Sequence, residues 1–327
     1  MQLEDSVHLF QATYDKRDYS GAANIFLDAL NLHPSNAYRH FAIHVSSQLS
    51  EVMSATKRIK EFAQIMNDMF PTNPQMNILN LGDYENTVLI DRLRNENIDK
   101  GLPSILLATQ GKSGSISVSN IFNSGFHLPS ISYALINQRV VPNWTLDYMR
   151  GGACHVTHLY PYSDQAQLLK EGGVDRMFVH VRDPRQTLVS LVHHLEKYPT
   201  QLGRLRDMAD QGNSVSEKAL MVLPFYRNAI RWIDGWVKLS EEIPITFSTF
   251  EDMVDDWEAF VEKYLENYGG PREHFSMENA TPLRHDTDYH FREGRPDEWR
   301  GVFSANESKM LSDLLPEHLK VRFDWRE

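Results

Sequence analysis

The chain of 327 residues has one cysteine, a deficit of positive charge and no long apolar run. Cys154 cannot form a disulfide within the chain, which favours a reducing, cytoplasmic compartment. The formal net charge of −11 argues against duplex nucleic acid or a sulfated polysaccharide, because broad basic surfaces bind both. No apolar stretch reaches the roughly 18 residues of a membrane span, and the N-terminal residues include none of signal-peptide length. We therefore expect neither a membrane nor a nucleic acid as a partner.

The composition that is present is typical of a folded globular chain, with 41% hydrophobic and 24% charged residues. Up to about residue 97, apolar residues recur at helical spacing, and Pro34 and Pro71 each follow an amphipathic segment. The stretch 18–34 resembles one tetratricopeptide repeat, in which small residues let paired helices approach and proline ends the second helix. Because such arrays need about three repeats, we expect residues 1–100 to form a helical cap, with a partner-binding solenoid as the alternative.

From Pro103 onward the pattern changes to short apolar runs that are each followed by a helical segment. Four of these runs are predicted strands, at residues 104–109, 153–158, 177–181 and 243–248. Strands that alternate with helices predict a mostly parallel sheet covered by helices on both faces. We therefore expect residues 101–327 to form an α/β domain, with its ligand site beyond the carboxyl ends of the strands.

The first predicted strand leads into the loop Gly111-Lys112-Ser113-Gly114-Ser115, which opens a helix. Backbone N–H groups and the helix dipole converge there, so the loop predicts an anion site. Lys112 adds a positive charge, and Ser113 and Ser115 are expected to add hydroxyl donors. The G-x-x-x-x-G-K-[ST] pattern of nucleoside triphosphatases fails, because Leu106 stands where it requires glycine. The alternative interpretation is a glycine-serine turn with a solvated lysine.

A second candidate anion site follows the predicted strand at 177–181. Arg182-Asp183-Pro184 leads into an amphipathic helix, in which Asp183 can cap the N-terminus and Pro184 suits the first turn. Ser190 follows Arg182 by eight residues, about two helical turns, so its hydroxyl could face the start of the helix. A guanidinium forms paired hydrogen bonds to oxyanions, so this pair predicts a second phosphate site. An Arg–Asp turn that only caps the helix is the alternative.

Four separated elements, taken in chain order, resemble motifs of the sulfotransferases that use 3′-phosphoadenosine 5′-phosphosulfate (PAPS). They are Lys112-Ser113-Gly114-Ser115, Thr157-His158-Leu159, Arg182-Asp183-Pro184 with Ser190, and Arg292-Glu293-Gly294 followed by Trp299. Residues 247–253 are also similar to a strand and a tyrosine-glutamate-aspartate helix start of that family. The resemblance runs from about residue 103 to the C-terminus, and it implies a P-loop-like three-layer α/β/α fold with a mostly parallel sheet.

The resemblance implies a role for each matching residue. His158 is the expected general base for the acceptor hydroxyl, a role that suits an imidazole because it titrates near pH ~6.5. Lys112 is expected to stabilise the charge that develops on the leaving bridge oxygen. No metal is expected. The residues expected to bind PAPS are Lys112, Ser113, Gly114, Ser115, Ile116, Ser117, Arg182, Ser190, Tyr226, Arg292 and Gly294.

The predicted site departs from the family pattern at Ser117 and Glu293, and a third residue, Tyr226, has two interpretations. Ser117 stands where many members have a tryptophan that stacks on adenine, so the base must be held in another way. Tyr226 either supplies an aromatic contact, by alignment with a family tyrosine, or packs within its helix. Glu293 replaces the basic middle residue of the C-terminal loop, which weakens phosphate binding there unless Arg295 compensates.

The expected reaction moves the sulfuryl group from PAPS to a hydroxyl or amine and leaves adenosine 3′,5′-bisphosphate. The acceptor is expected to be a soluble small molecule, such as an alcohol, a phenol or a cationic natural product, or a group held on a carrier protein. Two other functions remain open. One is a small-molecule kinase or nucleotide hydrolase, and the other is a non-catalytic helical-repeat adaptor with a degenerate nucleotide fold.

Overall fold

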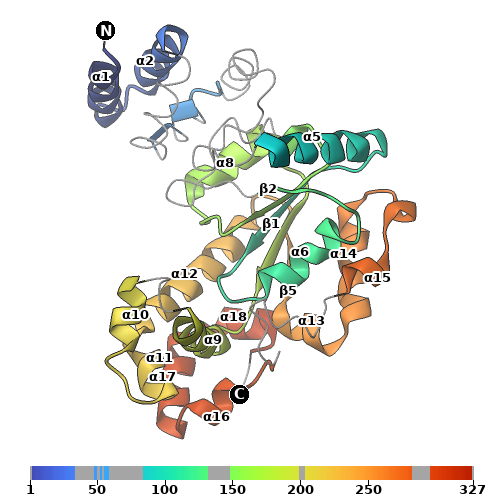
Figure 1. Ribbon diagram of the computed structural model, residues 1–327. Coiled ribbons are helices and arrows are strands. Elements are labelled where there is room, and N and C mark those ends of the chain that lie inside the picture. The colour runs from blue at the N-terminus through green and yellow to red at the C-terminus, as the bar shows by residue number, and fades with distance from the viewer. Residues whose placement is uncertain are drawn as a thin grey trace.

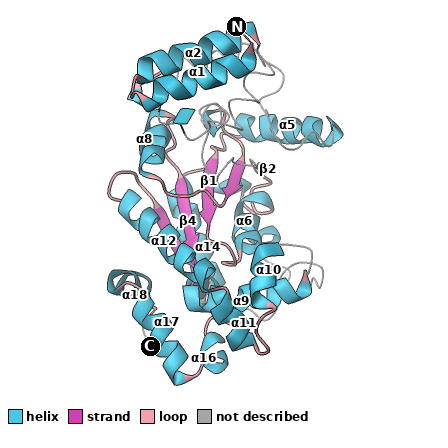
Figure 2. Ribbon diagram, turned by 90° about the vertical axis from the view of Figure 1, so that its left-hand side faces the viewer, coloured by secondary structure: helices cyan, strands magenta, loops and turns pink. Residues whose placement is uncertain are grey.

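The computed structural model describes residues 2–33, 48–49, 52–53, 55–58, 84–131, 148–198, 203–281 and 295–325. These residues contain a five-stranded sheet whose strands pair in the order β2-β3-β1-β4-β5, all of them parallel. Figures 1 and 2 show the sheet at the centre of the molecule. Its strands are β1 (Ile105–Thr109), β2 (Ser130–Ile131), β3 (Cys154–Thr157), β4 (Met177–Val181) and β5 (Thr246–Thr249).

The four predicted strands are confirmed as β1, β3, β4 and β5. The central strands β1 and β4 are buried along their whole length, which explains why they read as continuous apolar runs rather than as alternating ones. The last strand begins at Thr246, three residues later than predicted, because Pro244 cannot donate a hydrogen bond to a neighbouring strand. The short edge strand β2 was not predicted, since two residues carry no periodic pattern.

Helices cover both faces of the sheet, as the alternating pattern predicted. Leu106 and Val179 belong to one core, with helices α8 (Ser163–Glu171), α9 (Pro184–Lys197) and α12 (Leu223–Leu239). Leu107 and Phe178 belong to the other core, with α6 (Ser115–Asn123), α13 (Phe250–Asp255) and α14 (Trp257–Tyr268). The α/β fold with three layers is therefore confirmed (Figure 1).

The remaining described helices lie around these layers. At the N-terminal end are α1 (Leu3–Asp15), α2 (Tyr19–Leu32) and α5 (Tyr84–Asp99). The later ones are α10 (Gly203–Ala209), α11 (Val215–Met221), the 3₁₀ helix η2 (Arg272–His274), α15 (Met277–Ala280), α16 (Trp299–Val302), α17 (Ala305–Leu314) and α18 (Glu317–Phe323). Among the described residues we find no helix with the length and apolar character that crossing a bilayer requires.

Helices α1 and α2 form the first part of the predicted helical region. The Asp18 side chain caps α2 by accepting the Gly21 N–H at 2.9 Å, and Phe10 and Phe26 are buried in the same continuous cluster as the α8 side of the sheet. Both views place these helices beyond the amino ends of the strands, beside α5 and α8 (Figures 1 and 2). Pro34 and Pro71 lie outside the described residues, so the repeat remains a prediction.

Helix α5 is held against the segment that enters β3. The buried Arg94 side chain donates from Nε to the Gly151 carbonyl at 2.8 Å, and the Gly152 N–H donates to the Leu102 carbonyl at 2.9 Å. Gly152 has a φ of +69°, and a Cβ there would lie 2.6 Å from the Arg94 carbonyl oxygen and 3.0 Å from Ile98 Cγ1. This close approach requires glycine.

We expect Gly152→Ala to destabilise the protein more than Gly269→Ala does. Gly269 has a φ of +70° with no atom within 4 Å of the Cβ position, so both alanines carry the left-handed cost but only Gly152→Ala adds the contact with Arg94. Overpacking of this kind costs about 1–3 kcal/mol. Urea unfolding of both variants measures the difference, and equal losses would contradict the packing of α5 on this segment.

Candidate functional site

The register of the strands brings the ends of β1, β3 and β4 to one edge of the sheet. Thr157 pairs with Ala108, and His180 pairs with Thr109, so the residues that follow these strands leave the sheet side by side. Gln110 links two of the ends, because its Oε1 accepts the Arg182 N–H at 2.8 Å and its own N–H donates to the His180 carbonyl at 2.9 Å. The predicted location beyond the carboxyl ends is therefore where the candidate residues meet.

The loop between β1 and α6 contains two residues in the left-handed region. Lys112 has a φ of +68° and Gly114 a φ of +89°, and Gly114 is the N-cap of α6. A lysine in this conformation is strained by roughly 1–2 kcal/mol, and such strain concentrates at ligand-binding turns. Turns of this kind direct successive N–H groups into a concave anion site at the N-terminus of the helix.

Ser113 holds the turn closed. Its Oγ donates to the Gln110 carbonyl at 2.8 Å, its N–H donates to the same oxygen at 3.2 Å, and the residue is buried. The expected donation from this hydroxyl to a ligand remains a prediction, and it would compete with the bond to Gln110. Ser115 and Ser117 are half-buried at the start of α6 and Ile116 is exposed, so their contact with a ligand remains a prediction.

The loop and the second predicted anion element lie against each other. Arg182 donates from Nη1 to the Lys112 carbonyl at 3.3 Å, and its guanidinium carbon stacks 3.7 Å from the Phe250 ring centre. Burial, and then the Arg182 charge, lower the pKa of Lys112 to about 8. Two cations from different strands therefore share one partly buried location, which favours an anion as the ligand.

The C-terminal segment also reaches Arg182. The Arg182 Nη2 donates to the Arg295 carbonyl at 2.9 Å. Arg292 and Gly294 were expected to bind the ligand from this segment, and both lie outside the described residues. Whether Arg295 compensates for Glu293 through its charge remains a prediction, since the contact with Arg182 is made by the Arg295 backbone.

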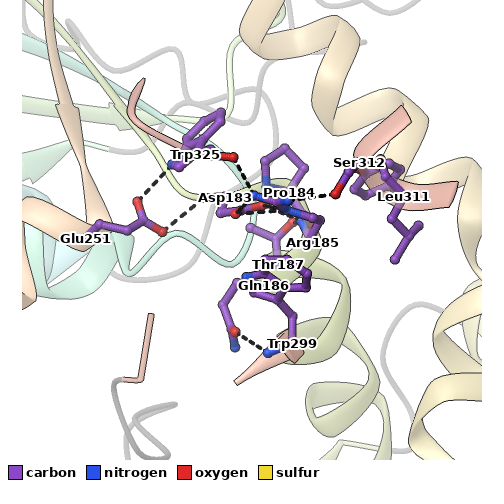
Figure 3. A network of polar contacts seen from close by, with 11 residues as sticks. Asp183, Pro184, Arg185, Gln186, Thr187, Glu251, Trp299, Leu311, Ser312 and Trp325 are labelled. Carbon is purple, nitrogen blue, oxygen red and sulfur yellow. Dashed lines mark hydrogen bonds and ion pairs between the residues drawn. The ribbon is translucent and has the colours of Figure 1, made fainter. Parts of the chain in front are cut away.

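The turn that carries Arg182 is fixed by a buried network, shown in Figure 3. Asp183 caps α9 by accepting the Arg185 N–H at 2.8 Å, and Pro184 occupies the first turn, as predicted. The buried Arg185 side chain pairs with Asp183 at 2.7 Å and donates to Ser312 Oγ at 2.8 Å and to the Trp325 carbonyl at 2.6 Å. Residues far along the chain, in α17 and just after α18, therefore hold the Arg182 turn in place.

Glu251 extends this network at the start of α13. Its carboxylate accepts the Asp183 N–H at 3.2 Å and the Trp325 Nε1–H at 3.3 Å (Figure 3). Burial, and then the negative charge of Asp183, raise the pKa of Glu251 to about 7. This carboxyl therefore gains a proton more readily in the folded protein than in the unfolded chain.

His158 lies at the same edge, directly after β3. Its Nδ1 is 2.7 Å from the Thr109 carbonyl oxygen and 3.2 Å from Thr109 Oγ1. A carbonyl only accepts hydrogen bonds, so Nδ1 carries the proton and Nε2 has the lone pair of a base. His158 is exposed, whereas His155 is buried with its ring centre 5.6 Å from that of Tyr148. Among the described residues, no three His, Cys, Asp or Glu side chains are grouped to hold a metal ion.

Tyr226 lies in the interior of the fold. The residue is fully buried in α12, and its hydroxyl donates to the Leu311 carbonyl at 2.6 Å. This bond joins α12 to α17, and the contact of the Tyr226 ring with a nucleotide remains a prediction. Ser190 is the one residue between 184 and 192 that is not fully buried, and its contact with a ligand remains a prediction.

Two aromatic residues border the loop and were not predicted from the sequence. A Cβ at Gly111 would lie 3.7 Å from the ring of Phe225, which is half-buried on α12. A Cβ at Gly114 would lie 3.1 Å from the ring of Phe250, which also supports Arg182. Both contacts join residues more than a hundred positions apart, so no local sequence pattern predicts them.

Comparison with known proteins finds similarity to solved structures and none to family models or curated proteins. No protein-family model matches the chain, and no curated protein matches it. Among solved structures, mouse sulfotransferase SULT7A1 complexed with PAP is similar to this chain at 14% sequence identity, with a TM-score of 0.47. The match covers 68% of this chain and 89% of that chain. A likeness at this level does not establish a function.

The raised pKa of Glu251 predicts a fall in stability with rising pH. The carboxyl titrates near 4.5 ordinarily and at about 7 in the folded protein, so between these values the folded state holds a proton that the unfolded chain lacks. The free energy of unfolding therefore falls as the pH rises across this window. Glu251→Gln, which keeps an oxygen acceptor, is expected to remove that fall in urea unfolding.

The matched control is Glu258→Gln, which makes the same change at an exposed carboxyl in the first turn of α14. We expect this variant to lose stability with rising pH as the unmodified chain does. An unmodified chain and a Glu251→Gln variant with the same pH dependence would contradict the assignment.

Proposed function

We propose that this protein transfers the sulfuryl group of PAPS to a hydroxyl or amine of an acceptor. The observation that carries the proposal is the meeting of Lys112, Arg182 and His158 at one edge of the sheet. Arg182 donates to the Lys112 carbonyl, and His158 binds Thr109, three residues before Lys112. A double phosphate site beside a base is the arrangement that this reaction requires.

The donor is bound by both anion elements. The amides of the loop, together with Lys112, hold the 5′-phosphosulfate at the N-terminus of α6. Arg182 holds the 3′-phosphate, with Ser190, Arg292 and Gly294 as further contacts. The stacking of Arg182 on Phe250 and its bonds to two carbonyls support this assignment, because they fix a guanidinium next to the loop before any ligand arrives.

His158 acts as the general base. Its Nδ1–H is engaged by the Thr109 carbonyl, so Nε2 accepts the proton of the acceptor hydroxyl as that oxygen attacks sulfur. The new O–S bond forms in line with the bond from sulfur to the bridging oxygen, which breaks. Lys112 stabilises the negative charge that develops on the leaving phosphate, and adenosine 3′,5′-bisphosphate departs.

The domain assignment follows the same division. Residues 101–327 form the transferase domain in this proposal, and residues 1–100 form a helical cap. Helices α1 and α2 lie at the end of the sheet opposite the candidate site, which favours a role away from the reacting atoms (Figure 1). The acceptor is a small molecule or a group presented by a carrier protein.

Ligand-dependent stability distinguishes this proposal from its alternatives. Adenosine 3′,5′-bisphosphate at about 100 times its dissociation constant is expected to stabilise the protein by about 2.7 kcal/mol. ATP at the same concentration is expected to stabilise it much less, because Leu106 replaces the glycine of a nucleotide triphosphatase loop. Thermal unfolding measures both. A larger shift with ATP would favour a kinase, and no shift with either would favour an adaptor.

Lys112→Ala is expected to slow sulfuryl transfer by on the order of 10²-fold or more, since it removes a positioned charge from the leaving group. The assay follows label from PAPS into a phenol, an alcohol and an amine. The matched control is Lys309→Ala, which removes an exposed lysine paired with Asp313 on α17. Turnover by Lys112→Ala equal to that of the control would contradict the catalytic assignment.

A further inference from the structure

A buried chain of hydrogen bonds runs beneath the anion loop. His180 lies near the end of β4 and is fully buried, with Nε2 2.9 Å from the Ser113 carbonyl oxygen. Its Nδ1 is 2.8 Å from Ser248 Oγ on β5, and that oxygen is 2.6 Å from the Tyr264 hydroxyl on α14. One continuous chain of polar atoms therefore connects α14 to the loop.

The carbonyl oxygen at one end of this chain determines which atom is the donor in each hydrogen bond. The Ser113 carbonyl can only accept, so Nε2 of His180 carries the proton. In the neutral ring Nδ1 must then accept, which makes the Ser248 hydroxyl the donor. Ser248 Oγ in turn accepts the Tyr264 O–H. Burial, with a smaller contribution from the charges of Arg182 and Lys263, lowers the pKa of His180 to about 3. This pKa agrees with a neutral ring.

The bond to Ser113 sets the orientation of the next peptide group. In a trans peptide the carbonyl and the following N–H point in opposite directions, and the chain contains no cis peptide bonds among its described residues. Because His180 draws the Ser113 carbonyl inward, the Gly114 N–H is directed outward at the N-terminus of α6. Gly114, whose N–H is part of this peptide group, has the left-handed φ of +89°.

We propose that His180 is a positioning residue that locks the Ser113–Gly114 peptide with its N–H toward the bound anion. A rotated peptide would instead present the carbonyl oxygen, which repels an anion. Ser248 and Tyr264 act through His180, because they hold its ring in the donating tautomer. The inference rests on the proposed function only for the identity of the anion, since the orientation of the peptide serves any phosphate or sulfate.

The test compares His180→Leu with His180→Gln, which retains an N–H donor. We expect His180→Leu to weaken the binding of adenosine 3′,5′-bisphosphate by about tenfold, the value of one hydrogen bond. His180→Gln is expected to recover part of that loss. The stability control is Val179→Ala, which trims a buried residue of the same strand and should leave the affinity unchanged. Equal affinities for His180→Leu and the control would overturn the proposal.

A spectroscopic readout separates positioning from packing. In protein labelled with ¹⁵N-glycine, the Gly114 amide signal is expected to shift when either adenosine 3′,5′-bisphosphate or inorganic pyrophosphate is added. That shift should be small in His180→Leu and present in Val179→Ala. If His180→Leu does not fold, Tyr264→Phe and Ser248→Ala provide the same comparison, with smaller losses expected because the bond from His180 to Ser113 remains.

The two anions distinguish the failure of this inference from the failure of the proposed function. A Gly114 shift with pyrophosphate that depends on His180, without binding of the bisphosphate, would support the positioning role and overturn the donor assignment. Tight binding of the bisphosphate that is indifferent to His180 would overturn the positioning role alone. No binding of either anion would overturn both.

Discussion

The common edge at which β1, β3 and β4 end is the constraint on which the candidate site depends. Parallel strands in this register end at the same edge of the sheet. The loop after β1, His158 after β3 and Arg182 after β4 are therefore neighbours although they are far apart in the sequence. Gln110 fixes this edge further, since it bonds to the backbone of both His180 and Arg182. The strand register of the sheet therefore determines where the candidate site lies, and the loops then supply its residues.

Holding two cations together is unfavourable, and several other interactions in the fold compensate for it. Burial and the neighbouring guanidinium both disfavour the charged amine of Lys112, which is why its pKa is lowered. Arg182 is stabilised by the carbonyl oxygens of Lys112 and Arg295 and by the face of Phe250. The adjacent Asp183–Arg185 pair is buried with its hydrogen bonds satisfied, which is the condition under which such a pair is tolerated. An anion bound at the loop would relieve the remaining repulsion.

The sequence was sufficient for four of the five strands, the loop and the cap of α9, because local periodicity or adjacent residues such as Asp183 and Pro184 indicate each of these. It was insufficient where a side chain is committed to a distant partner. Tyr226 could be placed ahead of a predicted helix, but only the fold shows that its hydroxyl reaches Leu311. Arg185 binds the backbone of Trp325, and His180 binds Ser113 and Ser248, across separations that no spacing rule covers. The contributions of Arg292 and Gly294 remain predictions.

The central claim is that one ligand is held at two ends by cations from different strands, and a titration series tests it most directly. Adenosine 3′,5′-bisphosphate and adenosine 5′-phosphate are titrated into the unmodified chain and into Arg182→Gln. In the unmodified chain, loss of the 3′-phosphate should weaken binding by about tenfold or more, whereas in Arg182→Gln the two ligands should bind nearly alike. The same penalty in both proteins would show that Arg182 does not hold that phosphate and would contradict the account.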